Sequence, residues 1–167
     1  IFEKEARTIY NNPILYTDGT AKEDLNRIEQ KFHVKIHAEV REHYLMYNGG
    51  YPKKPVFRQN GEEYIVDWFI PVRRGKGRSI EKTLGLLRED DGVIPEWLIP
   101  FADEDGGEIL LFQRQRSDFG AVYYYDHEFE YGEDPEEHIA YLAESITAFI
   151  NALTANEDDE DEEDDEE

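Results

Sequence analysis

The sequence predicts an α+β fold in which helices pack on one face of a mostly antiparallel sheet. Apolar residues recur at helical spacing near both ends of the chain. Between them, short runs of β-branched and aromatic residues alternate with turn residues. The 167 residues suit one domain and a tail, and no internal repeat is visible. We expect a folded domain over residues 1–156 and a disordered acidic tail over residues 157–167.

The first predicted helix begins after Thr20. Thr20 and Glu23 have the spacing of a capping box, in which each side chain bonds the backbone N–H of the other residue. Leu25, Ile28 and Phe32 then follow at helical spacing, so we expect them on the buried face.

A second helix is expected over residues 38–47, with Val40, Tyr44 and Tyr47 on its buried face. The run Asn48-Gly49-Gly50 should end this helix. Glycine adopts the left-handed backbone conformation at a helix C-terminus without a steric clash of Cβ.

The middle of the chain is typical of strands. Residues 64–70 are rich in β-branched and aromatic side chains, and Pro100 should lie at a sheet edge or a bulge. Two further strands should pair as a hairpin across residues 114–120. In order, we expect a strand at 64–70, a basic loop at 73–78, a short helix capped by Ser79 that carries Ile80, Leu84 and Leu87, a strand at 98–102, a turn at 103–107, and strands at 109–112 and 121–125.

A long final helix is predicted from residue 135 onward. Asp134 has the position of its N-cap, Pro135 that of its first residue, and Glu137 follows three residues after the cap. The apolar stripe of this helix should contain Ile139, Leu142, Ile146, Phe149, Ile150 and Leu153.

Negative charge dominates the composition. The formal net charge is −22, and all eleven residues of the tail are Asp or Glu, so residues 1–156 still carry −11. Such a protein repels nucleic acid and anionic membranes and favours a basic partner. The chain contains no cysteine and no apolar run of the roughly 18 residues needed to span a bilayer. Both observations fit a cytoplasmic protein.

Three segments in series resemble the SMI1/KNR4 (SUKH) superfamily. They are the helix end at residues 44–52 (YLMYNGGYP), the segment at 97–107 (WLIPFADEDGG) and the segment at 120–128 (GAVYYYDHE). One departure is visible, because the family usually has Pro where this chain has His37-Ala38. The resemblance implies an α+β fold and no catalysis. It also implies, for bacterial members, an immunity protein that binds and blocks a toxin, often a nuclease. Fungal relatives are regulatory proteins of cell-wall signalling.

Catalytic and ligand-binding patterns are weak. Neighbours in Asp126-His127-Glu128 point to opposite faces of a strand, so these side chains do not converge. Residues 103–107 are too short for a calcium loop and suit an acidic turn. Residues 75–79 (GKGRS) lack the spacer of a phosphate loop and suit a solvated loop or a docking site for the acidic tail. We therefore expect neither an enzyme, a cofactor nor a metal.

The sequence thus predicts a cytoplasmic immunity protein that occludes the active site of a basic toxin, which we expect to be a nuclease. The alternative function is a regulatory scaffold or adaptor of the SMI1/KNR4 type. The alternative role of the tail is only to keep the protein soluble. The predicted partner-binding residues are acidic and come from the turn, the end of the last strand and the tail: Asp103, Glu104, Asp105, Asp126, Glu128, Glu130, Glu157, Asp158, Asp159 and Glu160.

Overall fold

The α+β class is confirmed by a computed structural model, which describes residues 9–15, 18–20, 22–72, 77–87, 98–104, 110–114, 119–125 and 139–157. The described elements, in chain order, are β1 (Ile14–Leu15), α1 (Lys22–Phe32), α2 (Ala38–Met46), β2 (Tyr51–Pro52), β3 (Val56–Gln59), β4 (Glu62–Phe69), α3 (Ile80–Gly85), β5 (Leu98–Glu104), β6 (Leu110–Arg114), β7 (Val122–Tyr125), β8 (Ile139–Ala143) and α4 (Ile146–Ala152).

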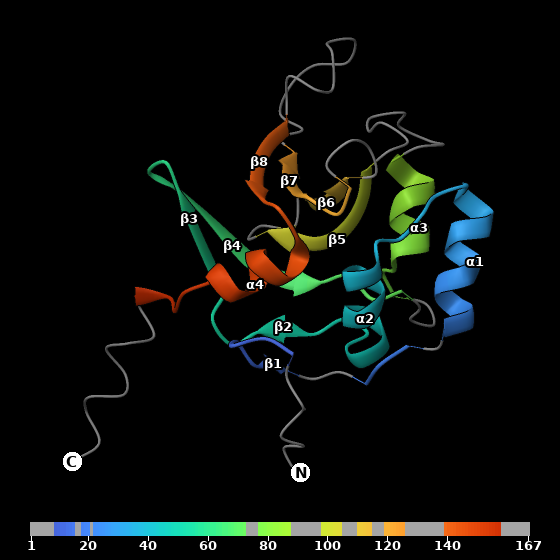
Figure 1. Cartoon of the computed structure of the whole chain (residues 1–167), viewed down its shortest axis with the longest axis horizontal. Helices are drawn as coiled ribbons and strands as arrows, with labels where there is room; N and C mark the ends of the chain where they lie inside the picture. The colour runs from blue at the N-terminus through green and yellow to red at the C-terminus, as the bar shows by residue number, and fades with distance from the viewer. Residues whose placement is uncertain are drawn as a thin grey trace.

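Six of the strands form one antiparallel sheet in the order β3-β4-β5-β6-β7-β8 (Figure 1). Each strand pairs with the next one along the chain, so β3 and β8 are the two edges. The sheet is strongly curved, because Tyr64 of β4 and Tyr124 of β7 lie three strands apart, yet their rings meet edge to face with centroids 4.7 Å apart. Strands β1 and β2 form a separate antiparallel pair.

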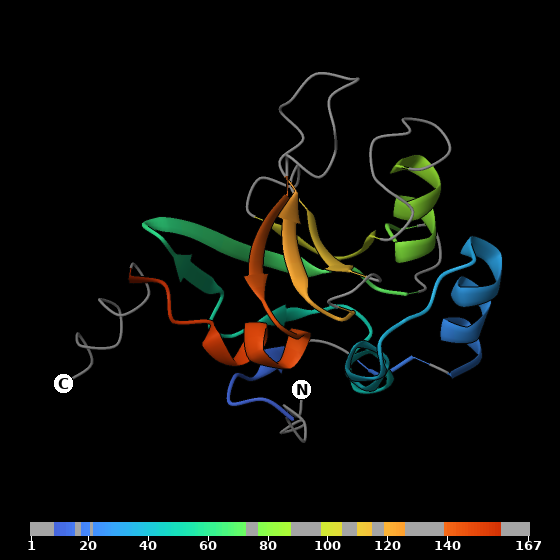
Figure 2. The same cartoon turned by 45° about the horizontal axis from the view of Figure 1, so that its top comes forward.

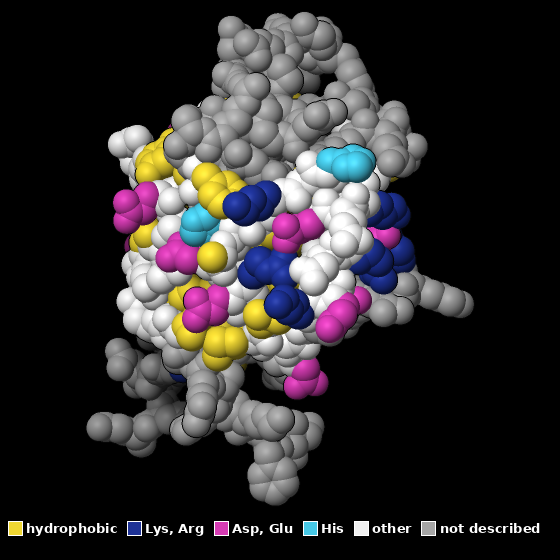
Figure 3. Space-filling model, turned by 45° about the vertical axis from the view of Figure 1, so that its right-hand side comes forward, with side chains coloured by type: hydrophobic (Ala, Val, Ile, Leu, Met, Phe, Trp, Pro, Cys, Tyr) yellow, Lys and Arg dark blue, Asp and Glu magenta, His cyan; other side chains and the backbone are white. Residues whose placement is uncertain are grey.

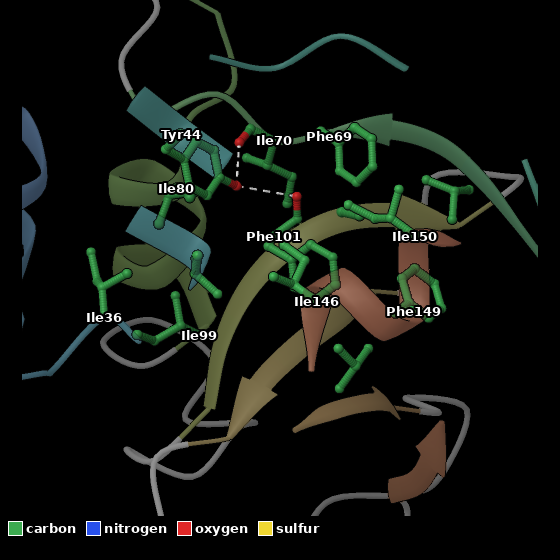
Figure 4. Packing of buried hydrophobic residues seen from close by; sticks show 14 of the residues in the cluster. Ile36, Tyr44, Phe69, Ile70, Ile80, Ile99, Phe101, Ile146, Phe149 and Ile150 are labelled. Carbon is green, nitrogen blue, oxygen red and sulfur yellow. Dashed lines mark hydrogen bonds between the residues drawn. The ribbon is translucent and has the colours of Figure 1, made fainter. Parts of the chain in front are cut away.

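Helices α2 and α4 lie on the same side of this sheet, together with β1 and β2 (Figure 2). The core lies between these helices and the central strands. Phe149 of α4 meets Phe101 of β5 edge to face at 6.1 Å, and Phe101 stacks on Phe69 of β4 at 6.5 Å. Figure 4 shows Ile146 and Ile150 from α4 facing the same strands. All five side chains are fully buried, so the helices are held mainly by apolar contacts.

Tyr44 of α2 contributes a polar contact inside this core. Its hydroxyl lies 2.9 Å from the carbonyl oxygen of Ile70 and 3.3 Å from that of Phe101, one just after β4 and one in β5 (Figure 4). Burial raises the Tyr44 pKa well above its ordinary value, so the hydroxyl keeps its proton and donates it to these carbonyls.

Both ends of α2 follow from local sequence. His37, which stands where the family pattern has Pro, is the N-cap, and its Nδ1 accepts a hydrogen bond from the Glu39 N–H at 3.2 Å. Gly49 has a φ of +100° and Gly50 a φ of +80°, which confirms the predicted helix stop. The Asn48 side chain accepts a hydrogen bond from the Val72 N–H at 2.7 Å and so joins this turn to the sheet.

The segment that leads into α1 crosses the end of α2 at very close range. The Thr20 N–H bonds the Tyr44 carbonyl at 2.8 Å, and the Asn48 N–H bonds the Asp18 carbonyl at 2.7 Å. A Cβ atom on Gly19, between these two bonds, would lie 1.8 Å from the Leu45 carbonyl oxygen. Only glycine fits this crossing.

The predicted long final helix is wrong in its first half. Residues 139–143 form strand β8, which pairs with β7, and α4 begins only after Ser145, whose hydroxyl accepts a hydrogen bond from the Ala148 N–H at 3.0 Å. Ile139 and Leu142 have helical spacing, and in a regular strand they would face opposite sides. Pairing with β7 overrides this local pattern, and the register shift opposite Leu142 breaks the alternation that would have indicated a strand. Asp134, Pro135 and Glu137 lie outside the described residues.

The acidic turn predicted at residues 103–107 is wrong for Asp103 and Glu104, because β5 continues through both; residues 105–107 lie outside the described residues. Pro100 lies in this central strand and not at an edge. The register with β6 shifts between Pro100 and Ala102, so the bulge alternative is the correct one. A proline has no N–H for the ladder, and a bulge accommodates that loss.

Several other predicted elements agree with the structure, whereas residues 73–76 of the predicted basic loop lie outside the described residues. The strand predicted at 64–70 is β4, and the hairpin of β6 and β7 is present. Ser79 caps α3 by accepting a hydrogen bond from the Lys82 N–H at 3.2 Å, and Ile80 and Leu84 are buried. Helix α1 (Lys22–Phe32) confirms the first predicted helix, but the Thr20 hydroxyl donates to the Asp24 carboxylate at 3.3 Å, so the capping box predicted with Glu23 stays a prediction. The short strands β1, β2 and β3 have no counterpart in the prediction.

None of the helices in the described ranges combines the length and the hydropathy that a bilayer crossing requires.

We predict that Gly19→Ala destabilises the protein by about 3 kcal/mol or more, because the new methyl group meets a backbone carbonyl that cannot rotate away. Chemical denaturation followed by circular dichroism measures this loss. Gly85→Ala in α3 is the matched control, since nothing lies within 4 Å of its added Cβ. The control should be neutral or stabilising by up to about 1 kcal/mol. Equal effects of the two substitutions would contradict the close crossing.

Candidate partner-binding surface

Charge is divided unequally along the chain. All 18 Lys and Arg residues precede Ser117, whereas the 40 Asp and Glu residues divide into 20 before it and 20 after it. Residues 1–116 therefore carry −2 and residues 117–167 carry −20, which together give the net −22. We call residues 117–167 the acidic segment; it contains β7, β8 and α4. A running count of charge along the sequence would have revealed this division, which total charge alone conceals.

Cations of the first part form ion pairs within the molecule. Arg27 and Lys31 of α1 both reach Glu81 of α3, at 3.0 and 2.7 Å, and the hydrogen bond from Lys31 is the main cause of a lowered Glu81 pKa. Arg41 of α2 pairs with Glu29 of α1. Figure 3, which faces α1 and α3, shows both signs of charge side by side. In these pairs, the positive charge is compensated by carboxylates of the same part of the chain and not by the acidic segment.

Glu157 is the one predicted tail residue that the structure describes. Its side chain is 85% exposed, and its carboxylate lies 3.6 Å from the guanidinium of Arg58 on β3. Arg58 also pairs with Glu63 at 2.9 Å and bonds the hydroxyl of Thr154. Shared in this way and open to water, the contact with Glu157 is weak, so its carboxylate remains available to a partner.

Asp103 has a different environment from the exposed turn that the sequence suggested. It is 7% exposed in β5, and one carboxylate oxygen accepts a hydrogen bond from the Arg78 guanidinium at 2.5 Å. The other oxygen, Oδ1, is buried without a hydrogen-bond partner. Desolvation raises the Asp103 pKa to about 6; Arg78 opposes this rise and Asp67 adds to it. The carboxylate therefore contacts Arg78 inside the protein, where it holds the start of α3 against β5, and is not exposed to a partner.

The remaining predicted residues are placed as follows. Glu104 ends β5 and is partly exposed, so its role at an interface stays a prediction. The others lie outside the described residues: Asp105, Asp126, Glu128, Glu130, Asp158, Asp159 and Glu160.

Tyr141 on β8 is a surface residue that sequence reasoning could not select. It is 48% exposed, and its ring lies edge to face against Tyr123 of β7 with centroids 5.6 Å apart. Tyr141 belongs to the acidic segment and has carboxylates on both sides of it in the sequence, at Glu137 and Glu144. Tyrosine is enriched among residues that dominate binding energy at interfaces. The surface thus offers an aromatic contact within an acidic region.

His43 of α2 is the most perturbed histidine among the described residues, and it is fully buried. Its Nδ1 lies 2.8 Å from the Tyr10 hydroxyl, Nε2 has no hydrogen-bond partner, and desolvation lowers the pKa to about 3. A neutral imidazole enclosed by Tyr44, Tyr47 and Phe69 packs as a core residue. No group of three or more potential metal ligands occurs in the described ranges, and His127 lies outside them.

The buried ion pair of Asp103 predicts a specific pH dependence. Because the native pKa of about 6 lies above the ordinary 3.8, the native state binds the proton more tightly. The free energy of unfolding contributed by Asp103 therefore falls as pH rises from about 4 to about 6. Asp103→Asn has no carboxyl group to ionise at this position, so the variant does not lose this free energy. The free energy of unfolding of the variant, relative to that of the wild type, should therefore rise by about 2–3 kcal/mol between pH 4 and pH 7. Urea denaturation at the two pH values measures the gain.

Glu144→Gln provides the control, because Glu144 is an exposed carboxylate beyond β8. It removes one carboxylate from the surface and should change the free energy of unfolding by no more than about 0.5 kcal/mol. A constant difference for Asp103→Asn would show that Asp103 ionises without a cost.

Comparison with known proteins places these features in a family. The model of the SMI1/KNR4 family (SUKH-1) matches residues 19–152, which include every helix and all strands except β1. A search of curated proteins found no match. Because the family model covers well over half of the chain, the protein belongs to the SMI1/KNR4 (SUKH-1) family.

Proposed function

We propose that this protein is an immunity protein that binds a basic protein toxin in the cytoplasm and covers the toxin's active site. The family is known for immunity proteins, is linked to toxin binding and is generally non-enzymatic. The observation that carries the proposal is the division of charge. A net −20 over residues 117–167, with no Lys or Arg among them, favours a cationic partner.

A nuclease domain is the class of toxin that this charge fits best. Nucleases hold the phosphates of their substrate with Lys and Arg side chains, and exposed carboxylates compete for the same side chains. The immunity protein then acts by occupying the site, with no chemical step of its own.

The tail and the folded body have separate roles in this proposal. Residues 157–167 attract the partner, because opposite charges can raise association rates to roughly 10⁸–10⁹ M⁻¹s⁻¹ at low salt. This attraction fades beyond about 8 Å at physiological salt, so the lasting contact needs desolvated groups on the body, residues 1–156. Of the segment predicted at 103–105, partly exposed Glu104 suits such a contact better than buried Asp103.

Co-expression with the product of the adjacent open reading frame tests the proposal. We expect this product, or its C-terminal domain, to be basic, to arrest growth when produced alone, and to co-purify with the immunity protein. Growth arrest should be relieved by the wild-type chain. A neighbour that is acidic, harmless and not co-purified would contradict the proposal.

We further predict that the location of negative charge matters more than its amount. Neutralising Glu157, Asp158, Asp159 and Glu160 to their amides should slow association with the basic partner by about 3–10-fold at low salt. The matched control neutralises four exposed acids outside the acidic segment, Glu23, Glu42, Glu62 and Asp67, and should change the rate less than twofold. Stopped-flow fluorescence at low and high salt compares them. Equal slowing would assign the effect to net charge alone.

A further inference from the structure

The two edges of the six-stranded sheet differ in protection. At β3, Val56 and Thr154 exchange two backbone hydrogen bonds of 3.0 and 2.8 Å, so the segment after α4 covers that edge. Strand β8 pairs with β7 on one side. On its other side, no described residue is hydrogen-bonded to it. Within the part of the chain that the structure describes, the outward N–H and C=O groups of β8 therefore form an open edge.

Strand β8 also lacks most devices that usually protect an edge. Its sequence, Ile-Ala-Tyr-Leu-Ala, contains neither a charge nor a proline. The register with β7 shifts between Val122 and Tyr123, opposite Leu142, so Ile139, Ala140 and Tyr141 keep regular pairing. Those of the three whose N–H and C=O groups point away from β7 can pair with another extended chain.

Tyr141 adds a side-chain contact at this edge. Its ring is 48% exposed although Tyr123 supports it from the neighbouring strand. In an antiparallel pair, an incoming side chain opposite Tyr141 would lie about 4.5–5.5 Å from it, measured between Cβ atoms. The edge thus offers backbone pairing and one half-exposed aromatic ring together.

Charge decides which extended chain fits. A second copy would bring its own acidic segment, with a net −20, against that of the first, and repulsion disfavours this pair. An extended segment with Lys or Arg would instead be attracted. We propose that the open edge of β8 receives a strand from the basic partner, which extends the sheet. This inference rests on the proposed function, because it names how the partner binds.

A cationic peptide of about nine alternating Lys and Val residues is the probe, since it forms a strand with one charged face. It should bind the full-length protein and slow hydrogen exchange of outward-facing amides within residues 139–143 by about fivefold or more. A Glu-Val peptide tests the charge, and a Lys-Pro peptide of equal charge tests strand pairing, because proline lacks the N–H donor. Both should bind at least about tenfold more weakly.

Two proline variants locate the contact on the protein. Neighbouring N–H groups in a strand point to opposite edges, so either Ala140 or Tyr141 directs its N–H away from β7. Proline at that position should leave the melting temperature close to the wild type and weaken peptide binding about tenfold. Proline at the other position breaks the β7 ladder and serves as the destabilised reference. If both variants unfold, hydrogen exchange of the wild type decides the test.

The results that would overturn the open-edge proposal differ from those that would overturn the proposed function. Equal binding of the Lys-Val and Lys-Pro peptides, or protection confined to other parts of the chain, would overturn the open-edge proposal. It would be overturned as well by a salt-induced dimer that protects residues 139–143, because a second copy would then be the occupant. In either case the adjacent gene product could still bind elsewhere and be neutralised. Failure of that product to bind at all would count against the proposed function itself.

Discussion

The hydroxyl of Tyr44 joins the helical layer to the centre of the sheet. It lies between the carbonyl oxygens of Ile70 and Phe101, whose own strands are bonded by the Ile70 N–H and the Phe101 carbonyl at 2.9 Å. A buried donor that meets acceptors on two strands fixes both the depth and the rotation of α2. The helix stop at Gly49 and the close crossing at Gly19 both lie at the C-terminal end of this helix, within five residues of Tyr44 or against its neighbour Leu45.

Core residues and ion pairs are distributed differently along the chain. Residues that set the fold lie in both charge regions, since α4 from the acidic segment supplies Phe149 to a core that α2 and β5 share. Ion pairs, in contrast, gather in the first part, where Glu81 alone receives Arg27 and Lys31. The acidic segment is therefore anchored in the core through α4, while its own sequence contains no Lys or Arg that could offset its negative charge.

Local sequence was sufficient to predict helix ends and helix starts, where a single residue type has one physical role. Gly49 and Gly50 identified the end of α2, and Ser79 identified the start of α3, because cap and turn chemistry depends on few neighbours. The final helix could not be predicted correctly, since Ile139 and Leu142 have helical spacing and the irregularity of β8 removes the alternation that would separate a strand from a helix. Only pairing with β7, a contact made through the tertiary structure, distinguishes them. For the same reason, the burial of Asp103 and the exposure of Tyr141 could not be predicted from the sequence, because both depend on which strands become neighbours.

The path of α4 has a consequence for how a partner would be held. This helix carries the chain from β8, at one edge of the sheet, back to β3, at the other, where Thr154 bonds Val56 just before the tail begins. Along the sheet, the two edges are roughly 24 Å apart at ordinary strand spacing. The eleven acidic residues can extend about 36–40 Å. A protein that binds at the β8 edge can thus also be contacted by the acidic tail, which begins near β3. If both contacts form together, the second has a millimolar effective concentration.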